Sequence, residues 1–99
     1  MNMPSFQQFE ATALAQDFDE VIERHWAADT LLDTHSHPFA VSALVVEGSF
    51  CLTVGDQARQ LQAGDRFVLD ADVPHAEHYG AQGARYWVAR RHPRAAAAD

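Results

Sequence analysis

The chain has 99 residues, of which 47% are hydrophobic and 10% aromatic, and this is typical of one globular domain rather than a disordered segment. Fourteen acidic residues against seven basic ones give a formal net charge of −7, and every basic residue is an arginine. An acidic surface repels phosphate groups, so the composition argues against nucleic acid and anionic membranes as partners.

The first predicted element is a short amphipathic helix within residues 5–16. Ser5 and Gln8 have the spacing of a capping box, and Phe6 and Phe9 recur at a helical interval. We expect the two phenylalanines to close one side of a small barrel. An arm that binds a partner is the alternative.

Two strands follow the helix, and the second ends in a pair of histidines. Residues 19–26 alternate between apolar and polar side chains, and residues 31–34 run into His35 and His37 after a turn. Side chains at positions i and i+2 of a strand share a face, so we expect both imidazoles to point the same way. Imidazole nitrogens bind zinc, iron, nickel and copper, and the pair therefore predicts half of a tetrahedral metal site.

Pro38 predicts a bend, after which residues 40–46 form a strand that is apolar on nearly both faces. The core of one barrel covers only one face of such a strand. We therefore expect a homodimer in which the outer face packs against a second copy.

The second half of the chain contains further short runs of strand character between turn signals. A corner is expected at Glu47–Gly48, a hairpin turn at Gly55–Asp56 and a loop between Gly80 and Gly83. The strands expected between these turns are residues 50–54, 58–61, 66–69, 75–79 and 85–90. A Val-Pro turn delivers His75, the third candidate metal ligand.

Many short strands with a single helical pattern predict an all-β sandwich or barrel. We divide the chain into an N-terminal helical arm (1–18), a barrel (19–92) and a flexible tail (93–99). Cys51 is the only cysteine, no apolar run approaches the roughly 20 residues that span a bilayer, and the N-terminus has no leader pattern. A cytoplasmic location is expected.

The residues around the three histidines resemble the two motifs of the cupin superfamily, G-x5-H-x-H-x3,4-E-x6-G and G-x5-P-x-G-x2-H-x3-N. The matching positions are His35, His37, Gly48, Gly64 and His75. The resemblance is to small single-domain bacterial members. It implies the cupin jelly roll, a double-stranded β-helix, with a divalent transition metal (iron, manganese, nickel or zinc) bound by the three histidines in the mouth of the barrel.

The chain departs from these motifs at functional positions. Val41 stands four residues after His37, where the first motif has its glutamate ligand, and Tyr79 replaces the closing asparagine of the second. Three neutral imidazoles leave a bound dication with a net charge of about +2, so the site should prefer a small anionic molecule. Sites of three histidines are found in cupin-like thiol and diketone dioxygenases.

Glu77 is the candidate catalytic residue. It lies two residues beyond His75, so strand alternation places its carboxylate on the same face. It can serve as a fourth metal ligand or as a general base with a pKa raised by the apolar barrel. The alternative is a carboxylate at the rim that pairs with Arg66, Arg85 or Arg90.

Two classes of function remain open. One is a metal-dependent oxygenase, isomerase or lyase that acts on a small anionic molecule inside the barrel. The other is a non-enzymatic binding or sensing barrel, similar to the ligand-binding domains attached to some bacterial transcription regulators.

Overall fold

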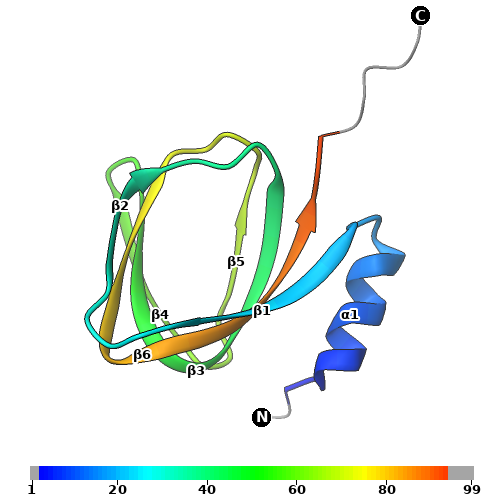
Figure 1. Cartoon of the computed structure of the whole chain (residues 1–99), viewed down its shortest axis with the longest axis horizontal. Helices are drawn as coiled ribbons and strands as arrows, with labels where there is room; N and C mark the ends of the chain where they lie inside the picture. The colour runs from blue at the N-terminus through cyan, green and yellow to red at the C-terminus, as the bar shows by residue number, and fades with distance from the viewer. Residues whose placement is uncertain (1–2, 94–99) are drawn as a thin grey trace, which may run out of the picture.

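The computed structural model describes residues 3–93, which form one helix and six strands. In chain order these are α1 (Phe6–Ala15), β1 (Glu20–Trp26), β2 (Leu31–His35), β3 (Ala40–Val54), β4 (Gln57–Gln62), β5 (Arg66–Leu69) and β6 (His75–Arg91). Figure 1 shows the strands rolled into a barrel, with α1 outside it. The predicted all-β barrel with a short N-terminal helix is confirmed. The predicted tail, residues 93–99, lies outside the described residues except for Pro93.

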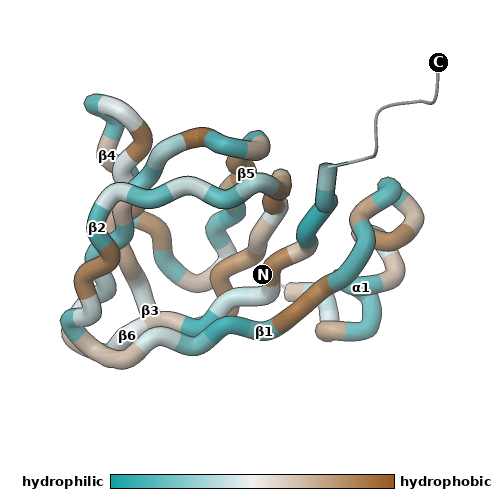
Figure 2. The backbone as a smooth tube through the Cα atoms, turned by 45° about the horizontal axis from the view of Figure 1, so that its top comes forward, coloured by the Kyte–Doolittle hydropathy of each residue, from teal (hydrophilic) through white to brown (hydrophobic). Residues whose placement is uncertain are grey.

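The helix begins at the predicted capping box. Ser5 Oγ accepts a hydrogen bond from the Gln8 backbone N–H (3.1 Å), and Gln8 Oε1 accepts one from the Ser5 N–H (2.8 Å). The buried face of the helix carries Phe9, which packs against Trp87 with ring centroids 6.0 Å apart. Figure 2 shows that the stretch of β1 running toward α1 is hydrophobic. The helix therefore covers one side of the barrel from outside. Within residues 3–93, no helix has the length and apolar character needed to cross a membrane.

Two long strands run through the whole barrel, and here two predictions are wrong. The expected corner at Glu47–Gly48 lies inside the 15-residue β3, and the expected loop between Gly80 and Gly83 lies inside the 17-residue β6. Shifts in the β3–β6 register on either side of Glu47–Gly48 bend the pair without ending it. Gly48 has φ +78°, and a Cβ there would lie 2.1 Å from the Gly83 carbonyl oxygen. Only glycine allows the two strands to approach so closely.

The bend divides the antiparallel sheet into two halves. The first half of β3 and the second half of β6 pair with each other and are flanked by β5 and β1, whereas the remaining halves are flanked by β4 and β2. The inner faces meet in a core whose largest fully buried side chains include Tyr79, Phe50 and Leu61. This is the arrangement that the resemblance implied.

The outer face of residues 40–46 is covered within the chain. Leu44 is only 2% exposed and belongs to the same buried cluster as Phe9 and Trp87, and Val46 packs against that cluster. The apolar face of this strand therefore gives no reason for a second copy. The homodimer stays a prediction that no longer has this support.

Candidate metal centre

The pairing of β2 with β6 brings His35 and His75 together. His35 is the last residue of β2, His75 is the first of β6, and the two are register partners. His37 lies beyond the end of β2, so the strand alternation predicted for the histidine pair does not apply. Its backbone is tied instead to the segment before β6, because the Asp72 N–H donates to the His37 carbonyl oxygen at 2.7 Å.

The three imidazole rings nevertheless meet at one place. Their centroids are 5.1 Å apart for His35 and His37, 4.4 Å for His35 and His75, and 4.9 Å for His37 and His75. One ring nitrogen from each lies within 4.8 Å of the other two, so the three predicted ligands form a group that could hold a metal ion.

Backbone carbonyls orient two of these rings. The carbonyl oxygen of Asp33 lies 2.7 Å from His35 Nδ1, and that of Val73 lies 2.9 Å from His75 Nδ1. A carbonyl only accepts hydrogen bonds, so in each neutral ring Nδ1 carries the proton and Nε2 presents a lone pair. This is the hydrogen-bonding pattern that prepares histidine to ligate metals.

Glu77 lies beside these two nitrogens. Its Oε2 is 3.4 Å from His35 Nε2 and 3.6 Å from His75 Nε2, and the residue is 6% exposed. Its other oxygen accepts a hydrogen bond from the Tyr79 hydroxyl. Two imidazole lone pairs and a carboxylate oxygen thus face one another with no donor between them, a set of atoms that a divalent cation fits.

The alternative partners of Glu77 are engaged elsewhere. Arg85 and Arg90 pair with carboxylates of β1, at 2.9 and 3.9 Å, and Arg66 lies over the ring of Phe9. Among residues 3–93, no arginine pairs with Glu77. Its carboxylate is buried next to the histidines rather than placed at the rim.

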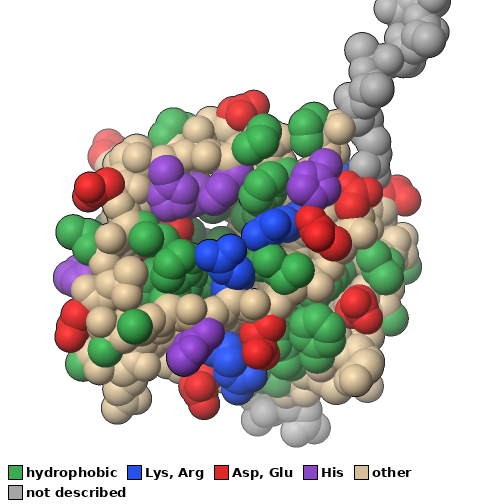
Figure 3. Space-filling model, viewed as in Figure 1, with side chains coloured by type: hydrophobic (Ala, Val, Ile, Leu, Met, Phe, Trp, Pro, Cys, Tyr) green, Lys and Arg blue, Asp and Glu red, His purple; other side chains and the backbone are tan. Residues whose placement is uncertain are grey.

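The histidines and Glu77 line a cavity of about 410 Å³. Its walls are largely apolar and include Leu32, Phe39, Val41, Leu69 and Val88. Figure 3 shows the hollow, with histidine side chains on one edge and arginine side chains on the opposite edge. The size and character of the cavity suit a small organic molecule.

The surroundings favour the ligating form of His37 and the donating form of Tyr79. Burial lowers the pKa of His37, and the neighbouring His75, His35 and Arg90 lower that pKa further. A neutral imidazole is the form that binds metal. Burial raises the pKa of the Tyr79 hydroxyl, which therefore keeps its proton and donates a hydrogen bond to Glu77.

Sequence reasoning missed several residues of the site. Arg24 and Trp26 of β1 line the cavity, as does Tyr86, whose hydroxyl oxygen accepts a hydrogen bond from Trp26 Nε1 at 3.1 Å. The alternation along β1 places Arg24 and Trp26 on one face, and Tyr79 lies two residues beyond Glu77. These spacings were the available signals, but they do not show which face is the inner one.

Comparison with known proteins identifies related sequences and folds. The profile of the family described as "Cupin domain" matches residues 25–86. No curated protein matches the sequence. Among solved structures, KdgF from Halomonas sp. superposes with a TM-score of 0.66 at 19% identity, and the match covers 75% of this chain and 68% of that one.

Two larger proteins contain the same fold. Oxalate decarboxylase from Bacillus subtilis, a protein with Mn(II) centres, matches with a TM-score of 0.67 at 18% identity over 77% of this chain and 22% of its own. An HTH_3 family transcriptional regulator from Vibrio cholerae matches with a TM-score of 0.62 at 20% identity over 75% of this chain and 43% of its own. The chain thus spans less than half of either protein, and identities this low establish the fold alone.

Proposed function

Because this chain belongs to the Cupin domain family, we propose that it binds one divalent transition metal through His35, His37 and His75 and acts on a small anionic molecule in the barrel. The observation that supports this most is the convergence of three imidazole nitrogens within 4.8 Å beside a buried carboxylate. Iron, manganese, nickel and zinc all accept such ligands.

Glu77 is proposed as the fourth ligand, in place of the glutamate that Val41 has replaced. Its Oε2 faces the same Nε2 atoms that would hold the metal, and Tyr79 holds the other oxygen. One carboxylate leaves the bound dication with a net positive charge, so the preference for an anionic partner remains. A carboxylate that ligates the metal is not free to act as a general base.

The proposed reaction class is that of a metal-dependent oxygenase, isomerase or lyase. When bound, the metal would supply a Lewis acid with open positions for substrate or water. The chain itself supplies apolar walls that limit the access of water, and Arg24 and Arg90 provide positive charge around the bound molecule. The Mn(II) centres of the structurally similar oxalate decarboxylase support a redox-active or Lewis-acidic metal in this fold.

Metal content tests the proposal. Elemental analysis of protein purified under metal-replete conditions should give about one divalent ion per chain, and His37→Ala should lose most of it. His78→Ala is the matched control, because His78 is an exposed histidine of β6. Equal metal content in all three proteins, or none in any, would contradict the proposed site.

A sensing barrel is the second candidate. It is supported by the similar fold within the Vibrio cholerae transcriptional regulator. The two candidates differ in the fate of the ligand. An enzyme converts the bound molecule, whereas a sensor releases it unchanged, so mass spectrometry of the ligand after prolonged incubation separates them.

A further inference from the structure

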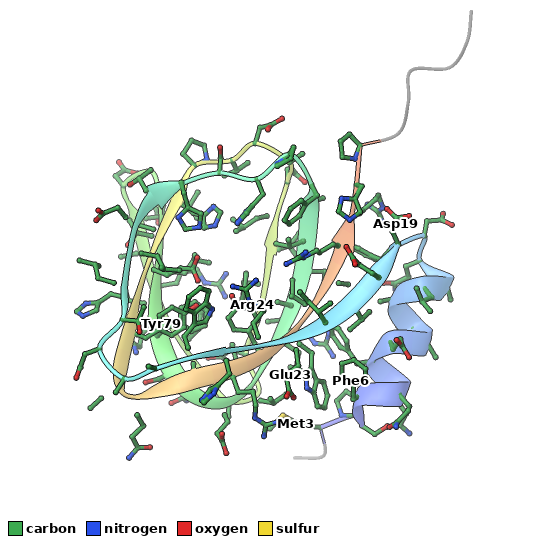
Figure 4. The ribbon with its side chains drawn as sticks, viewed as in Figure 1. Met3, Phe6, Asp19, Glu23, Arg24 and Tyr79 are labelled. Carbon is green, nitrogen blue, oxygen red and sulfur yellow. The ribbon has the colours of Figure 1, made fainter. Side chains whose placement is uncertain are left out.

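Arg24 differs from the other arginine of the cavity. Figure 4 shows its side chain inside the barrel, whereas Glu23, its neighbour on β1, lies on the outer side near α1. The Arg24 guanidinium carbon lies 4.8 Å from the centroid of the Trp26 ring. Among residues 3–93, no carboxylate forms an ion pair with Arg24, whereas Arg90 lies 3.9 Å from Glu20.

A guanidinium without an acidic partner is a ready anion site. It is always protonated, and its planar fork matches the two oxygens of a carboxylate. The Trp26 ring packs against the guanidinium without neutralising its charge. Two acidic residues also line the cavity: Glu77 is engaged with the histidines and Tyr79, and Asp33 is exposed.

We propose that Arg24 binds the carboxylate of the substrate and thereby selects small carboxylic acids with an apolar body. The apolar body would contact Leu32, Phe39, Val41 and Val88, and a second oxygen of the same molecule would face the histidines. A 2-oxo acid with a branched or aromatic side chain has these three features. The contact of the second oxygen rests on the proposed metal site, whereas the contact of the carboxylate with Arg24 does not.

The charge pattern of the opening supports this orientation. Histidine and arginine side chains occupy opposite edges of the hollow (Figure 3). With a metal bound at the histidine edge, both edges attract oxygen atoms, so a molecule held between them would present an acceptor group at each end. The two edges enclose a cavity of about 410 Å³, which is within the range of about 300–1,000 Å³ typical of small-molecule sites. The apolar walls between the edges exclude a molecule that is polar throughout.

Calorimetric titration with 4-methyl-2-oxopentanoate and with its methyl ester tests the proposal. Zinc-loaded wild-type protein should prefer the acid, and Arg24→Gln should weaken binding of the acid by about 10- to 100-fold while leaving that of the ester unchanged. Arg24→Lys keeps the charge without the fork and should recover part of the loss. Arg59→Gln, a change at an exposed arginine of β4, should have no effect.

Three results would overturn the inference. These are equal binding of the acid by wild type and both Arg24 variants, no preference of wild type for the acid over the ester, and no binding of either probe at millimolar concentration.

The same titration on metal-free protein, together with metal analysis, separates this inference from the proposed metal site. If the chain holds no metal but Arg24 still governs binding of the acid, the metal proposal fails and the carboxylate site stands. If the chain holds metal and the Arg24 variants bind the acid as wild type does, the carboxylate site fails and the metal proposal stands.

Discussion

Glu77→Gln separates a metal ligand from a general base. The amide has nearly the same shape as the carboxylate, and its oxygen can still accept the Tyr79 hydrogen bond. Its nitrogen can donate to the Nε2 atom of His35 or His75, because these atoms lie 3.4 and 3.6 Å from Oε2 of Glu77 in the wild type. The metal-free variant should therefore fold with a stability close to that of the wild type. The change removes only the negative charge.

The expected loss of metal affinity is large. Changes to groups that merely support a ligand reduce affinity by about 10- to 100-fold. Removing a carboxylate that touches the dication in a buried site should exceed the upper value, which corresponds to about 2.8 kcal/mol. With metal in excess, stabilisation of the folded state falls by the same amount, and for a chain of this size that lowers the melting temperature by roughly 10 °C or more.

Thermal unfolding with and without zinc or manganese measures this effect. Wild-type protein and Glu77→Gln should melt at similar temperatures without metal and should differ clearly with it. Equal stabilisation of both proteins by either metal would refute the assignment of Glu77 as a ligand. Glu77 would then be better explained as a general base that acts on the bound substrate.

Three further changes test the packing around the site. Tyr79→Phe should weaken metal binding by about 10-fold in a chelator competition, because Glu77 loses the hydroxyl that holds it; unchanged affinity would show that Tyr79 only fills space. Val41→Glu, combined with Glu77→Gln, should recover part of the lost metal affinity because Val41 lines the same cavity. A double variant that is destabilised and is not stabilised by zinc or manganese would count against the metal site. Phe9→Ala should lower the free energy of unfolding by about 3 kcal/mol in urea without altering metal content, since Phe9 is buried between α1 and the barrel. A loss of metal would mean that the helix shapes the site.

Local signals predicted the elements well. The capping box at Ser5 and Gln8, the hairpin at Gly55–Asp56 and the alternation along residues 19–26 all depend on neighbours in the chain, and the structure contains each of them. The bends at Gly48 and Gly83 were misread because a glycine with positive φ inside a bulged strand has the same sequence signal as a turn.

Local patterns in the sequence predict few of the contacts between distant segments. The convergence of His35, His37 and His75 was predicted through the resemblance, although His37 reaches the group from outside a strand. The burial of Glu77 depends on Tyr79 and on the pairing of β2 with β6. The cover that α1 places over Leu44 depends on the path of the chain after the helix, which no local pattern specifies.

The location of the metal is the most direct test of the account. Crystals of the metal-loaded protein, measured at the absorption edge of the bound element, should show one anomalous peak per chain within bonding distance of nitrogens from His35, His37 and His75 and of an oxygen from Glu77. A peak bound by other residues, or crystals of metal-treated protein with no peak in this cavity, would contradict it.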